Sequence, residues 1–349
     1  MKVLLVCHFV RLPYRVMRCA SLAGAEVYVL GDGVSKLLRF SRFCKRLYKT
    51  SCPFDGSVST DMVDQINKLS EELGIDVVMP GDPESSRSFA GIRDQLSARA
   101  FPGPSLKVFD LLNDKSSFAA LCTELDIPHP KSTFFCRKEQ LISEISSGNL
   151  GFPLVVKPLD QYGSRGFLKI TKENAAKQLE GFEYDKAIAQ EFVPGSDIGA
   201  SVFCRQGRIL TFIAHELVDG VYRTFERPDV YEVISRLAKH LSLEGVYNFD
   251  MRLTKEDQAV FLECNPRVFF KMFHSAIAGI NFLEPGLFPD RSGIATGRSE
   301  PTKTRGSRAL VKVVHKPWVL SQRDRQFAQS LVNDPINLLI ELTRIDAYN

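Results

Sequence analysis

Strand-like and helix-like segments alternate along the first quarter of the 349-residue chain. Residues 2–9 (KVLLVCHF) and 25–31 (AEVYVLG) are apolar runs typical of buried strands, and a helical stretch lies between them from about residue 14 to residue 22. Residues 60–74 show apolar side chains at helical spacing, and residues 75–81 (IDVVMPG) form a third apolar run. This βαβ alternation predicts an α/β domain with a parallel sheet covered by helices.

The ends of the predicted helices carry capping signals. Thr60 or Asp61 can cap the second helix, and Gly74 ends it. Asp82-Pro83-Glu84 places a cap, a proline and an acid in the order expected at the start of the next helix. The turn after the first strand, CHFVRLPYR, contains no glycine, so the GxGxxG fingerprint is absent. A dinucleotide-binding Rossmann enzyme is therefore disfavoured despite the layout.

The composition describes an ordinary globular protein, with 44% hydrophobic and 25% charged residues. No stretch approaches the roughly 18 consecutive apolar residues of a transmembrane helix. The opening MKVLLVCHFVRLPYR has a short apolar run followed by Arg and Pro, which predicts a first strand and not a signal peptide. Eight scattered cysteines without a CxxC pair suit free thiols in a reducing cytoplasm and argue against a zinc site.

Basic residues gather near the N-terminus, although the net charge of the chain is only +4. Positions 11–49 hold nine Lys and Arg residues against Glu26 and Asp32. Such a surface suits an anionic small molecule, nucleic acid or membrane lipid, and the alternative is an ordinary solvated helix and loop. Weak aromatic interleaving argues against a single-strand nucleic-acid platform, so no nucleic-acid partner is expected. Arg11 and Arg15 follow the first strand and are candidates to hold an acidic substrate.

Three polar residues interrupt the apolar run VFLECNPRVFF at every second position. Because a strand alternates its side chains between faces, Glu263, Asn265 and Arg267 point the same way. An earlier run, VYNFDMRL, carries Asp250, and the polar stretch between the two runs suits a turn. A hairpin that turns at Glu256-Asp257 places Asp250 opposite Glu263, with the two side chains about 5 Å apart.

Two carboxylates at that separation repel each other unless a cation lies between them. Oxygen ligands from Asp, Glu and Asn are those that magnesium takes, so Asp250, Glu263 and Asn265 are candidate metal ligands. The alternative is a surface hairpin with a solvated charged face. The neighbouring Phe261 and Phe269 argue against that alternative, because large apolar residues favour a buried setting.

Lys157 ends the apolar strand FPLVVKP (152–158), and the turn Gly163-Ser164-Arg165-Gly166 follows six residues later. An ammonium group beside a flexible glycine turn suits phosphate binding, because backbone N–H groups can approach the oxygens. A Lys-Pro pair and a tight turn between two strands are equally common as plain structure. The segment QEFVPGSDIG is either a hinge between domains or a strand that ends in a turn.

Taken in order, five separated motifs resemble the ATP-grasp superfamily over roughly residues 75–290. They are NDK (113–115), VVKP (155–158) with GSRG (163–166), QEFVPGSD (190–197), NFD (248–250) and ECNPR (263–267). The last looks much like the carbamoyl phosphate synthase branch, and biotin carboxylase and D-alanine–D-alanine ligase share the scheme. The resemblance implies that two α+β lobes of an ATP-grasp fold hold ATP between them, after an N-terminal Rossmann-like parallel-sheet domain.

The resemblance also implies a role for each matching position in the phosphate and metal region. Lys115 and Lys157 resemble the pair that contacts the α- and β-phosphates. The loop of Gly163, Ser164, Arg165 and Gly166 resembles the lid that folds over the β- and γ-phosphates. The metal ligands would be Asp250, Glu263 and Asn265. Arg267 would neutralise the transferring phosphoryl group, so that Arg267 and Lys157 are the expected catalytic residues.

The adenosine half of the nucleotide is expected to bind the segment after residue 189. By resemblance, the Gln190 side chain and the Glu191 carbonyl accept from the adenine amino group. The Val193 N–H donates to a ring nitrogen, and Asp197 accepts from the ribose hydroxyls. Two positions depart from well-known members, because Asp250 stands where Gln or Glu is common and Asp197 stands where many carry Glu. The shorter Asp250 arm would shift the metal or favour one ion over two.

Lys115 has a structural alternative, since Asn113-Asp114 suits a helix cap with Lys115 exposed in the first turn. Lys271 and His274 follow the metal strand and either reach the acceptor or begin a packed helix.

The expected chemistry activates a carboxylate by transfer of the γ-phosphoryl group, and an amine then displaces phosphate. No GxSxG signature supports a hydrolase. The leading hypothesis is therefore an ATP-dependent carboxylate–amine ligase. The alternatives are a phosphotransferase acting on bicarbonate, carbamate or a hydroxyl, and a non-catalytic ATP-binding module. The expected cofactors are ATP and Mg2+, with Mn2+ as an alternative ion, and the expected partners are small-molecule carboxylates and amines. A homodimer is left open.

The segment FPGPS (101–105) punctuates the chain and predicts a domain boundary. The predicted organisation is an N-terminal domain (1–105), an ATP-grasp domain (106–290) with a mobile lid lobe at about 115–187, and a linker with a C-terminal extension (291–349). In the extension, a strand is predicted at 309–314 and a helical end around 327–342, without an assigned role.

Overall fold

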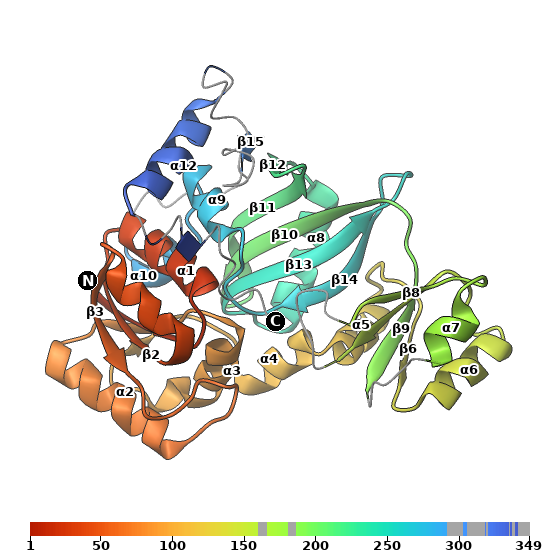
Figure 1. Cartoon of the computed structure of the whole chain (residues 1–349), viewed down its shortest axis with the longest axis horizontal. Coiled ribbons are helices and arrows are strands. Elements are labelled where there is room, and N and C mark those ends of the chain that lie inside the picture. The colour runs from red at the N-terminus through yellow and green to blue at the C-terminus, as the bar shows by residue number, and fades with distance from the viewer. Residues whose placement is uncertain are drawn as a thin grey trace. The chain divides into compact units, whose positions relative to one another are not determined.

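The computed structural model describes residues 1–159, 166–180, 186–291, 303–305, 318, 320–334, 336 and 339–340. Its contacts divide the chain into two compact units. The first unit comprises Met1–Phe109, Gly199–Asn248 and Asn265–Asn349, and the second comprises Asp110–Ile198 and Phe249–Cys264. Figure 1 shows the elements coloured along the chain. The domain boundaries expected from the sequence stay a prediction.

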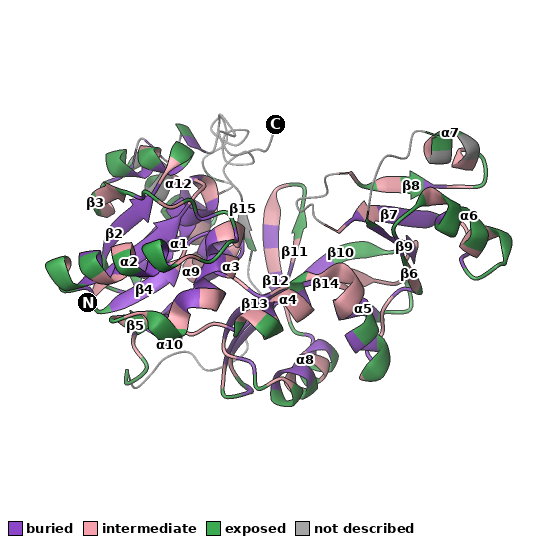
Figure 2. Cartoon of the chain, turned by 90° about the horizontal axis from the view of Figure 1, so that it is seen from below, coloured by how far each residue is buried: buried purple, intermediate pink, exposed green. Residues whose placement is uncertain are grey.

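The first unit contains the predicted parallel sheet, whose strand order is β3-β2-β1-β4-β5. Its strands are β1 (Lys2–Cys7), β2 (Glu26–Gly31), β3 (Cys44–Lys49), β4 (Val77–Pro80) and β5 (Arg99–Ala100), paired in parallel. The connections carry α1 (Arg11–Leu22), α2 (Thr60–Leu73), α3 (Pro83–Ile92) and the 3-10 turns η1 (Gly33–Phe40) and η2 (Arg93–Gln95). Strands β2 and β4 are purple in Figure 2, because helices and apolar side chains cover the sheet. The prediction of a parallel sheet is confirmed.

The ends of α2 follow from its flanking residues. Ser59 caps the helix, because its hydroxyl accepts the Met62 N–H at 3.3 Å. The prediction of Thr60 or Asp61 as the cap is therefore wrong, since both are already helical residues. The prediction that Gly74 ends the helix is confirmed, and its φ of 61° is the left-handed conformation that glycine adopts without a steric cost.

The second sheet has the strand order β14-β13-β10-β11-β12-β15. Its strands are β10 (Ser196–Arg205), β11 (Arg208–Val218), β12 (Val221–Phe225), β13 (Gly245–Leu253), β14 (Ala259–Asn265) and β15 (Lys303–Arg305). The pairs β10–β11, β11–β12 and β12–β15 are antiparallel. Helix α8 (Pro228–His240) packs against β11 through the buried Val230, Ile234 and Leu237. The two strands of the predicted metal hairpin, β13 and β14, are neighbours in this sheet.

A smaller antiparallel sheet lies in the second unit, with the strand order β6-β9-β7-β8. Its elements are β6 (Ser132–Phe135), β7 (Leu154–Pro158), β8 (Leu168–Ile170), β9 (Ala187–Glu191), α6 (Lys138–Ser146) and α7 (Ala175–Glu180). One face of the sheet packs into a core of its own, formed by Phe135, Leu141, Leu150, Leu154, Val156, Ile170, Ala187 and Ala189. This arrangement is an α+β lobe, as predicted.

The remaining helices connect or cover these sheets. They are α4 (Leu106–Asn113), α5 (Lys115–Glu124), α9 (Met272–Ile277), α10 (Glu284–Leu287) and α12 (Gln322–Val332). The predicted strand at 309–314 lies outside the described residues, and α12 begins ahead of the helical end that was predicted from residue 327. Within the part of the chain that the structure describes, no helix combines the length and the apolar character that a membrane crossing requires. The eight cysteines are free thiols, as predicted.

Described residues of the C-terminal segment contact α1 and the residue after η1. Buried Asp334 accepts hydrogen bonds through Oδ2 from the Tyr14 hydroxyl at 3.0 Å and the Ser41 hydroxyl at 2.5 Å. Phe327, Ile336 and Ile340 belong to the same hydrophobic core as strands β1, β2 and β4. These residues therefore complete the core of the first unit.

Candidate functional site

The register of the small sheet places Lys157 and Gln190 on one face. Gln190 of β9 is opposite Val155 of β7, and Lys157 is opposite Ile188. Directly opposed residues of antiparallel strands share a face, and so do residues two apart on one strand. The core-forming residues of β7 and β9 occupy the other face. The small sheet therefore presents the predicted phosphate lysine and the predicted adenine acceptor together.

The face that carries Lys157 and Gln190 is largely buried. Gln190 is 3% exposed, and its Nε2 donates to the Ser132 hydroxyl at 3.0 Å. That bond orients the amide and leaves its Oε1 as the hydrogen-bond acceptor. Glu191 faces the other way, and its Oε1 accepts the Gly151 N–H at 3.2 Å. The side chain of Glu191 is thus engaged elsewhere, which suits the predicted use of its main-chain carbonyl.

Charged residues of the second unit meet around Lys157. Burial lowers the pKa of the Lys157 ammonium, and the positive charge of Lys115 acts in the same direction. The carboxylates of Glu263, Asp250 and Asp197 act against this and raise the pKa of Lys157. Four other predicted site residues of this unit, from segments far apart in the sequence, therefore lie near enough to Lys157 for their charges to act on its pKa. Such a cluster suits a ligand that carries both anionic oxygens and a bound cation.

Lys115 is the first residue of α5, and Asp114 is the N-cap. Burial opposes ionisation of Asp114, but hydrogen bonds from Ser117 and Ser116 hold the pKa of its carboxyl below the usual value. The structural alternative for this segment, a helix cap, is thus present. It does not exclude the phosphate role, because the Lys115 charge acts on Lys157 from the same position.

The turn of the metal hairpin differs by one residue from the pairing expected from the sequence. The Asp257 N–H donates to the Thr254 carbonyl at 3.2 Å, and the Thr254 N–H donates to the Gln258 carbonyl at 3.0 Å. Asp257 has a φ of 63° and is the additional residue in the turn. The predicted register would instead pair Thr254 with Ala259. The central residues of this turn are Lys255 and Glu256, so the predicted turn at Glu256-Asp257 is wrong by one residue. The opposition of Asp250 to Glu263 stays a prediction.

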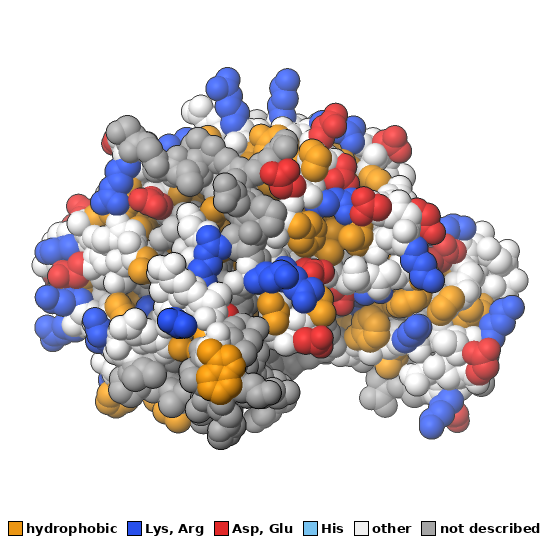
Figure 3. Space-filling view, turned by 90° about the horizontal axis from the view of Figure 1, so that it is seen from above, with side chains coloured by type: hydrophobic (Ala, Val, Ile, Leu, Met, Phe, Trp, Pro, Cys, Tyr) orange, Lys and Arg blue, Asp and Glu red, His pale blue; other side chains and the backbone are white. Residues whose placement is uncertain are grey.

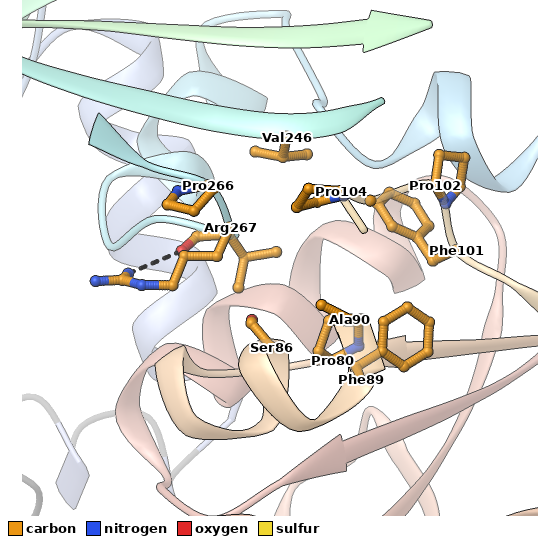
Figure 4. A pocket seen from close by; sticks show the side chains of 12 residues that line it. Pro80, Ser86, Phe89, Ala90, Phe101, Pro102, Pro104, Val246, Pro266 and Arg267 are labelled. Carbon is orange, nitrogen blue, oxygen red and sulfur yellow. Dashed lines mark hydrogen bonds between the residues drawn. The ribbon is translucent and has the colours of Figure 1, made fainter. Parts of the chain in front are cut away.

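Asn265 and Arg267 bond to each other at the end of β14, in the first unit. The Arg267 Nη2 donates to Asn265 Oδ1 at 2.8 Å, and Nη1 donates to the Val268 carbonyl at 3.3 Å. Arg267 also lines an apolar pocket of the first unit with Ser86, Phe89 and Phe101, and its guanidinium points away from those rings (Figure 4). A carbonyl oxygen has two lone pairs, so Asn265 Oδ1 can bind a cation while it accepts from Arg267.

The donor set fits a hard divalent cation. The predicted ligands have side chains of the types that bind Mg2+, since Asp250 and Glu263 carry carboxylates and Asn265 carries an amide oxygen. Within the described ranges, no three His, Cys, Asp or Glu residues gather as a metal cluster, which is expected for a site with two acids and one amide. Gly163, Ser164 and Arg165 lie outside the described residues. Gly166 has a φ of 63°, so the lid segment ends in a conformation that suits glycine.

The segment between β9 and β10 (residues 192–195), named the hinge below for its place in the chain, is held by Arg252, which sequence reasoning missed. Arg252 lies on β13, two residues after Asp250, and its guanidinium donates to Val193, Gly195 and Asp197. The available signal was the alternation of β13, which puts Arg252 on the face of Asp250. That signal does not identify the partners, because they lie more than fifty residues earlier in the chain.

A second group that sequence reasoning missed lies at the carboxyl ends of β1, β2 and β4. Buried Asp82 caps α3 as predicted, and its Oδ2 also accepts the His8 N–H at 2.6 Å. The His8 ring Nδ1 lies 2.7 Å from Asp32 Oδ1. Burial and the charge of Asp82 raise the pKa of the Glu84 carboxyl to about 7, while Arg267 acts to lower it. Ligands of open parallel sheets bind at such strand ends, where the strand order reverses between β1 and β4.

The predicted basic surface near the N-terminus is only partly exposed. Arg15 and Arg18 are 5% and 6% exposed, and the Arg15 guanidinium stacks 3.7 Å from the ring centroid of Phe270. On the face seen in Figure 3, Lys and Arg side chains are interspersed with Asp and Glu. His274 is buried, and its ring stacks on Phe327 at 4.9 Å. The packed alternative for His274 is therefore the one that the structure shows.

Sequence comparisons relate parts of this chain to known proteins. Residues 183–305 match the family model described as ATP-grasp in the biosynthetic pathway with Ter operon. A D-aspartate ligase of Enterococcus faecium is 24% identical over 265 residues, which cover 65% of this chain and 62% of that protein. The arginine-specific large chain of carbamoyl phosphate synthase of Bacillus subtilis is 25% identical over 189 residues, which cover 47% of this chain and 18% of that one. The chain thus spans less than two thirds of the length of these relatives.

A solved structure shows the same architecture. It is the biotin carboxylase domain dimer of the 2-oxoglutarate carboxylase of Hydrogenobacter thermophilus, in complex with MgADP, ADP and bicarbonate. The two folds superpose with a TM-score of 0.63 at 15% identity, over 84% of this chain and 71% of that one. The likeness shows that the two chains share a fold.

Proposed function

We propose that this chain is an ATP-dependent ligase of the ATP-grasp superfamily that joins a carboxylate to an amine, because residues 183–305 match an ATP-grasp family model and a D-aspartate ligase is similar in sequence. The observation that carries this proposal is the cluster of Lys115, Lys157, Asp250, Glu263 and Asp197 in the second unit. Beside these charges lie Gln190 and the hinge, whose side-chain and main-chain groups are suited to bind adenine. A cluster of ion pairs with a purely structural role does not require such groups. The relatives named D-aspartate ligase and carbamoyl phosphate synthase support the same class of chemistry.

ATP is assigned to the face of the small sheet that carries Lys157 and Gln190. Gln190, the Glu191 carbonyl and the Val193 N–H recognise adenine, and Asp197 accepts from the ribose. Lys115 and Lys157 neutralise phosphate oxygens, which lowers the repulsion that an anionic acceptor meets. The lid of Gly163, Ser164, Arg165 and Gly166 stays part of the proposal.

Asp250, Glu263 and Asn265 would hold Mg2+, with Mn2+ as the alternative ion. When bound, the metal supplies charge neutralisation to the transferring phosphoryl group and to the leaving diphosphate. Arg267 shares that task from the position beside Asn265. Its bond to Asn265 fixes the guanidinium, so that little reorganisation is needed as charge develops.

The proposed reaction needs no protein nucleophile. A carboxylate oxygen attacks the γ-phosphorus, a new O–P bond forms, and the bond between the γ-phosphorus and the bridging oxygen breaks to release ADP. The neutral amine then attacks the carbonyl carbon of the acyl phosphate. The C–O bond to phosphate breaks, phosphate leaves, and the amine proton passes to solvent. The products are an amide, ADP and phosphate.

The test is an ADP-release screen over carboxylates crossed with amines, in the presence of ATP and magnesium. A productive pair is then repeated with the carboxylate labelled with 18O, and the released phosphate is analysed by mass spectrometry. One labelled oxygen should appear in phosphate, because that oxygen bridges carbon and phosphorus in the acyl phosphate. Release of ADP without label transfer would refute the acyl-phosphate route.

Three other outcomes identify the alternatives. ADP release that requires bicarbonate and no other carboxylate identifies a bicarbonate phosphotransferase. A stable phosphorylated hydroxyl product identifies a kinase. Calorimetric ATP binding without turnover of any pair identifies a binding module. Lys157→Ala and Lys172→Ala serve as the matched variants, since Lys172 is an exposed lysine of the same unit without a proposed role.

A further inference from the structure

Arg252 joins the hinge to β13 through three separate atoms. Its Nε donates to the Val193 carbonyl at 3.1 Å, its Nη1 donates to Asp197 Oδ1 at 2.5 Å, and its Nη2 donates to the Gly195 carbonyl. A planar guanidinium has five N–H donors in a fixed fork, so three acceptors bound at once define its orientation and theirs. This fork holds hinge residues on both sides of Pro194.

The two partners of the ion pair differ strongly in exposure. The Arg252 side chain is 18% exposed and that of Asp197 is 86% exposed. An aspartate so open to water would ordinarily sample several rotamers, whereas the half-buried arginine is fixed by its two carbonyl partners. Arg252 therefore acts as the anchor and Asp197 as the group that is oriented. Because Arg252 engages Oδ1, the second oxygen of Asp197 is directed to an incoming hydroxyl donor.

Packing around Gly195 and Phe192 further restricts the conformation of the hinge. Gly195 has a φ of 144°, and a Cβ at this position would overlap the carbonyl oxygen of Leu253. The hinge backbone therefore lies directly against the strand that carries Arg252. The Phe192 ring lies under the Lys169 ammonium at 3.8 Å and near the Arg252 guanidinium at 5.7 Å. Cation–π contacts of this kind fix the ring on the strand side of the hinge.

We propose that Arg252 is a positioning residue that sets the ribose selectivity of the nucleotide site by holding Asp197. This inference rests on the proposed function, because it takes Asp197 as the acceptor of the ribose hydroxyls. The same strand carries Asp250 two residues earlier, so β13 aligns the ribose acid with a metal ligand. A site whose acceptor bonds a ligand hydroxyl rejects the analogue that lacks the hydroxyl, provided that the acceptor is held in place. Arg252 holds the Asp197 carboxylate in place.

The experiment measures affinities of the full chain for ATP, 2′-deoxyATP and 3′-deoxyATP with magnesium, by isothermal titration calorimetry. The wild-type protein should prefer ATP over the poorer deoxy analogue by about tenfold to a hundredfold, the scale of a hydrogen bond to a charged acceptor. In Arg252→Met the preference should fall to within about threefold. Arg252→Lys should resemble Arg252→Met, because an ammonium cannot serve three acceptors in one plane.

Two further variants separate positioning from general damage. Asp197→Asn should lose the same preference, and the double variant should lose no more than Asp197→Asn alone, because both changes remove one interaction. Lys255→Ala, an exposed change in the turn of the same hairpin, should keep the wild-type ratio.

The ratio of affinities distinguishes the outcomes. A merely structural role for Arg252 weakens all three nucleotides equally and leaves the ratio at its wild-type value, which would overturn this inference. Thermal melts of each variant show whether Arg252→Met is folded, and the ratio remains readable at lower affinity. A wild-type protein that does not bind ATP would overturn the proposed function and this inference with it, whereas binding of ATP without any ribose preference would overturn the inference alone.

Discussion

Replacement of Gly195 by alanine should separate the hinge from β13. The backbone of Gly195 has a φ of 144°, a region that residues with a Cβ rarely occupy. The added Cβ would overlap the Leu253 carbonyl oxygen and approach the Leu253 carbonyl carbon to 2.8 Å and Thr254 Cα to 3.2 Å. These neighbours are backbone atoms, and the turn hydrogen bond between Thr254 and Gln258 restrains them. The hinge must therefore move.

The structure gives the size of the effect. An unfavourable φ alone costs about 1–3 kcal/mol. Displacement of the hinge also weakens the Arg252 hydrogen bonds to the Val193 and Gly195 carbonyls, and bonds to charged groups contribute roughly 1.5–3 kcal/mol each, of which part is regained from water. We expect Gly195→Ala to lower the free energy of unfolding by about 3 kcal/mol or more.

Gly148→Ala is the matched control in the same unit. Gly148 has a φ of 75°, and no atom lies within 4 Å of a Cβ built there. Only the left-handed backbone is then penalised, at about 1 kcal/mol. Urea unfolding followed by circular dichroism measures both variants, and calorimetry measures their ATP affinity. Gly195→Ala should lose more stability by about 2 kcal/mol and bind ATP more weakly, whereas Gly148→Ala should bind as the wild type does. Equal losses of stability in the two variants would refute the steric argument.

Three other changes test the site. Glu84→Gln should stabilise the protein by about 1–2 kcal/mol at pH 8 and leave it unchanged near pH 4. Burial raises the pKa of Glu84 to about 7 in the folded state, so the free energy of unfolding of the wild-type protein falls as the pH rises from about 4.5 through 7. If the urea midpoint of the variant depends on pH as that of the wild type does, this reasoning is wrong. Glu263→Gln should lower magnesium-dependent ADP release by about a hundredfold, because it removes an oxygen ligand at the reacting centre, and the exposed Glu256→Gln is its control. Lys157→Ala should weaken ATP binding about tenfold or more in calorimetry, because a charge partner of the phosphates is lost, and unchanged affinity would remove Lys157 from the site.

Local signals predicted the framework of the first sheet well. Asp82-Pro83 marked the start of α3 and Gly74 marked the end of α2, because capping and left-handed geometry depend on neighbouring residues alone. The cap of α2 was harder, since Ser59, Thr60 and Asp61 are all capping residue types and sequence alone does not say where the helical dihedrals begin.

The candidate site was predictable as a set of residues and less so as a geometry. The period of β14 put Glu263 and Asn265 on one face, but the extra residue at Asp257 changed the pairing at the turn. The shared face of Lys157 and Gln190 depends on the register between two strands that are distant in sequence. Arg252 was missed for a related reason, because nothing near it in the chain indicates that it binds the hinge.

The contact between Tyr14 and Asp334 has a consequence for synthesis on the ribosome. The two residues are 320 positions apart, so α1 has been translated long before its partner exists. Nascent chains that stop before residue 320 should therefore leave α1 open to protease, and protection equal to that of the full-length chain would contradict this. Translation runs from the N-terminus, yet α1 acquires this partner only after residue 334 has been made.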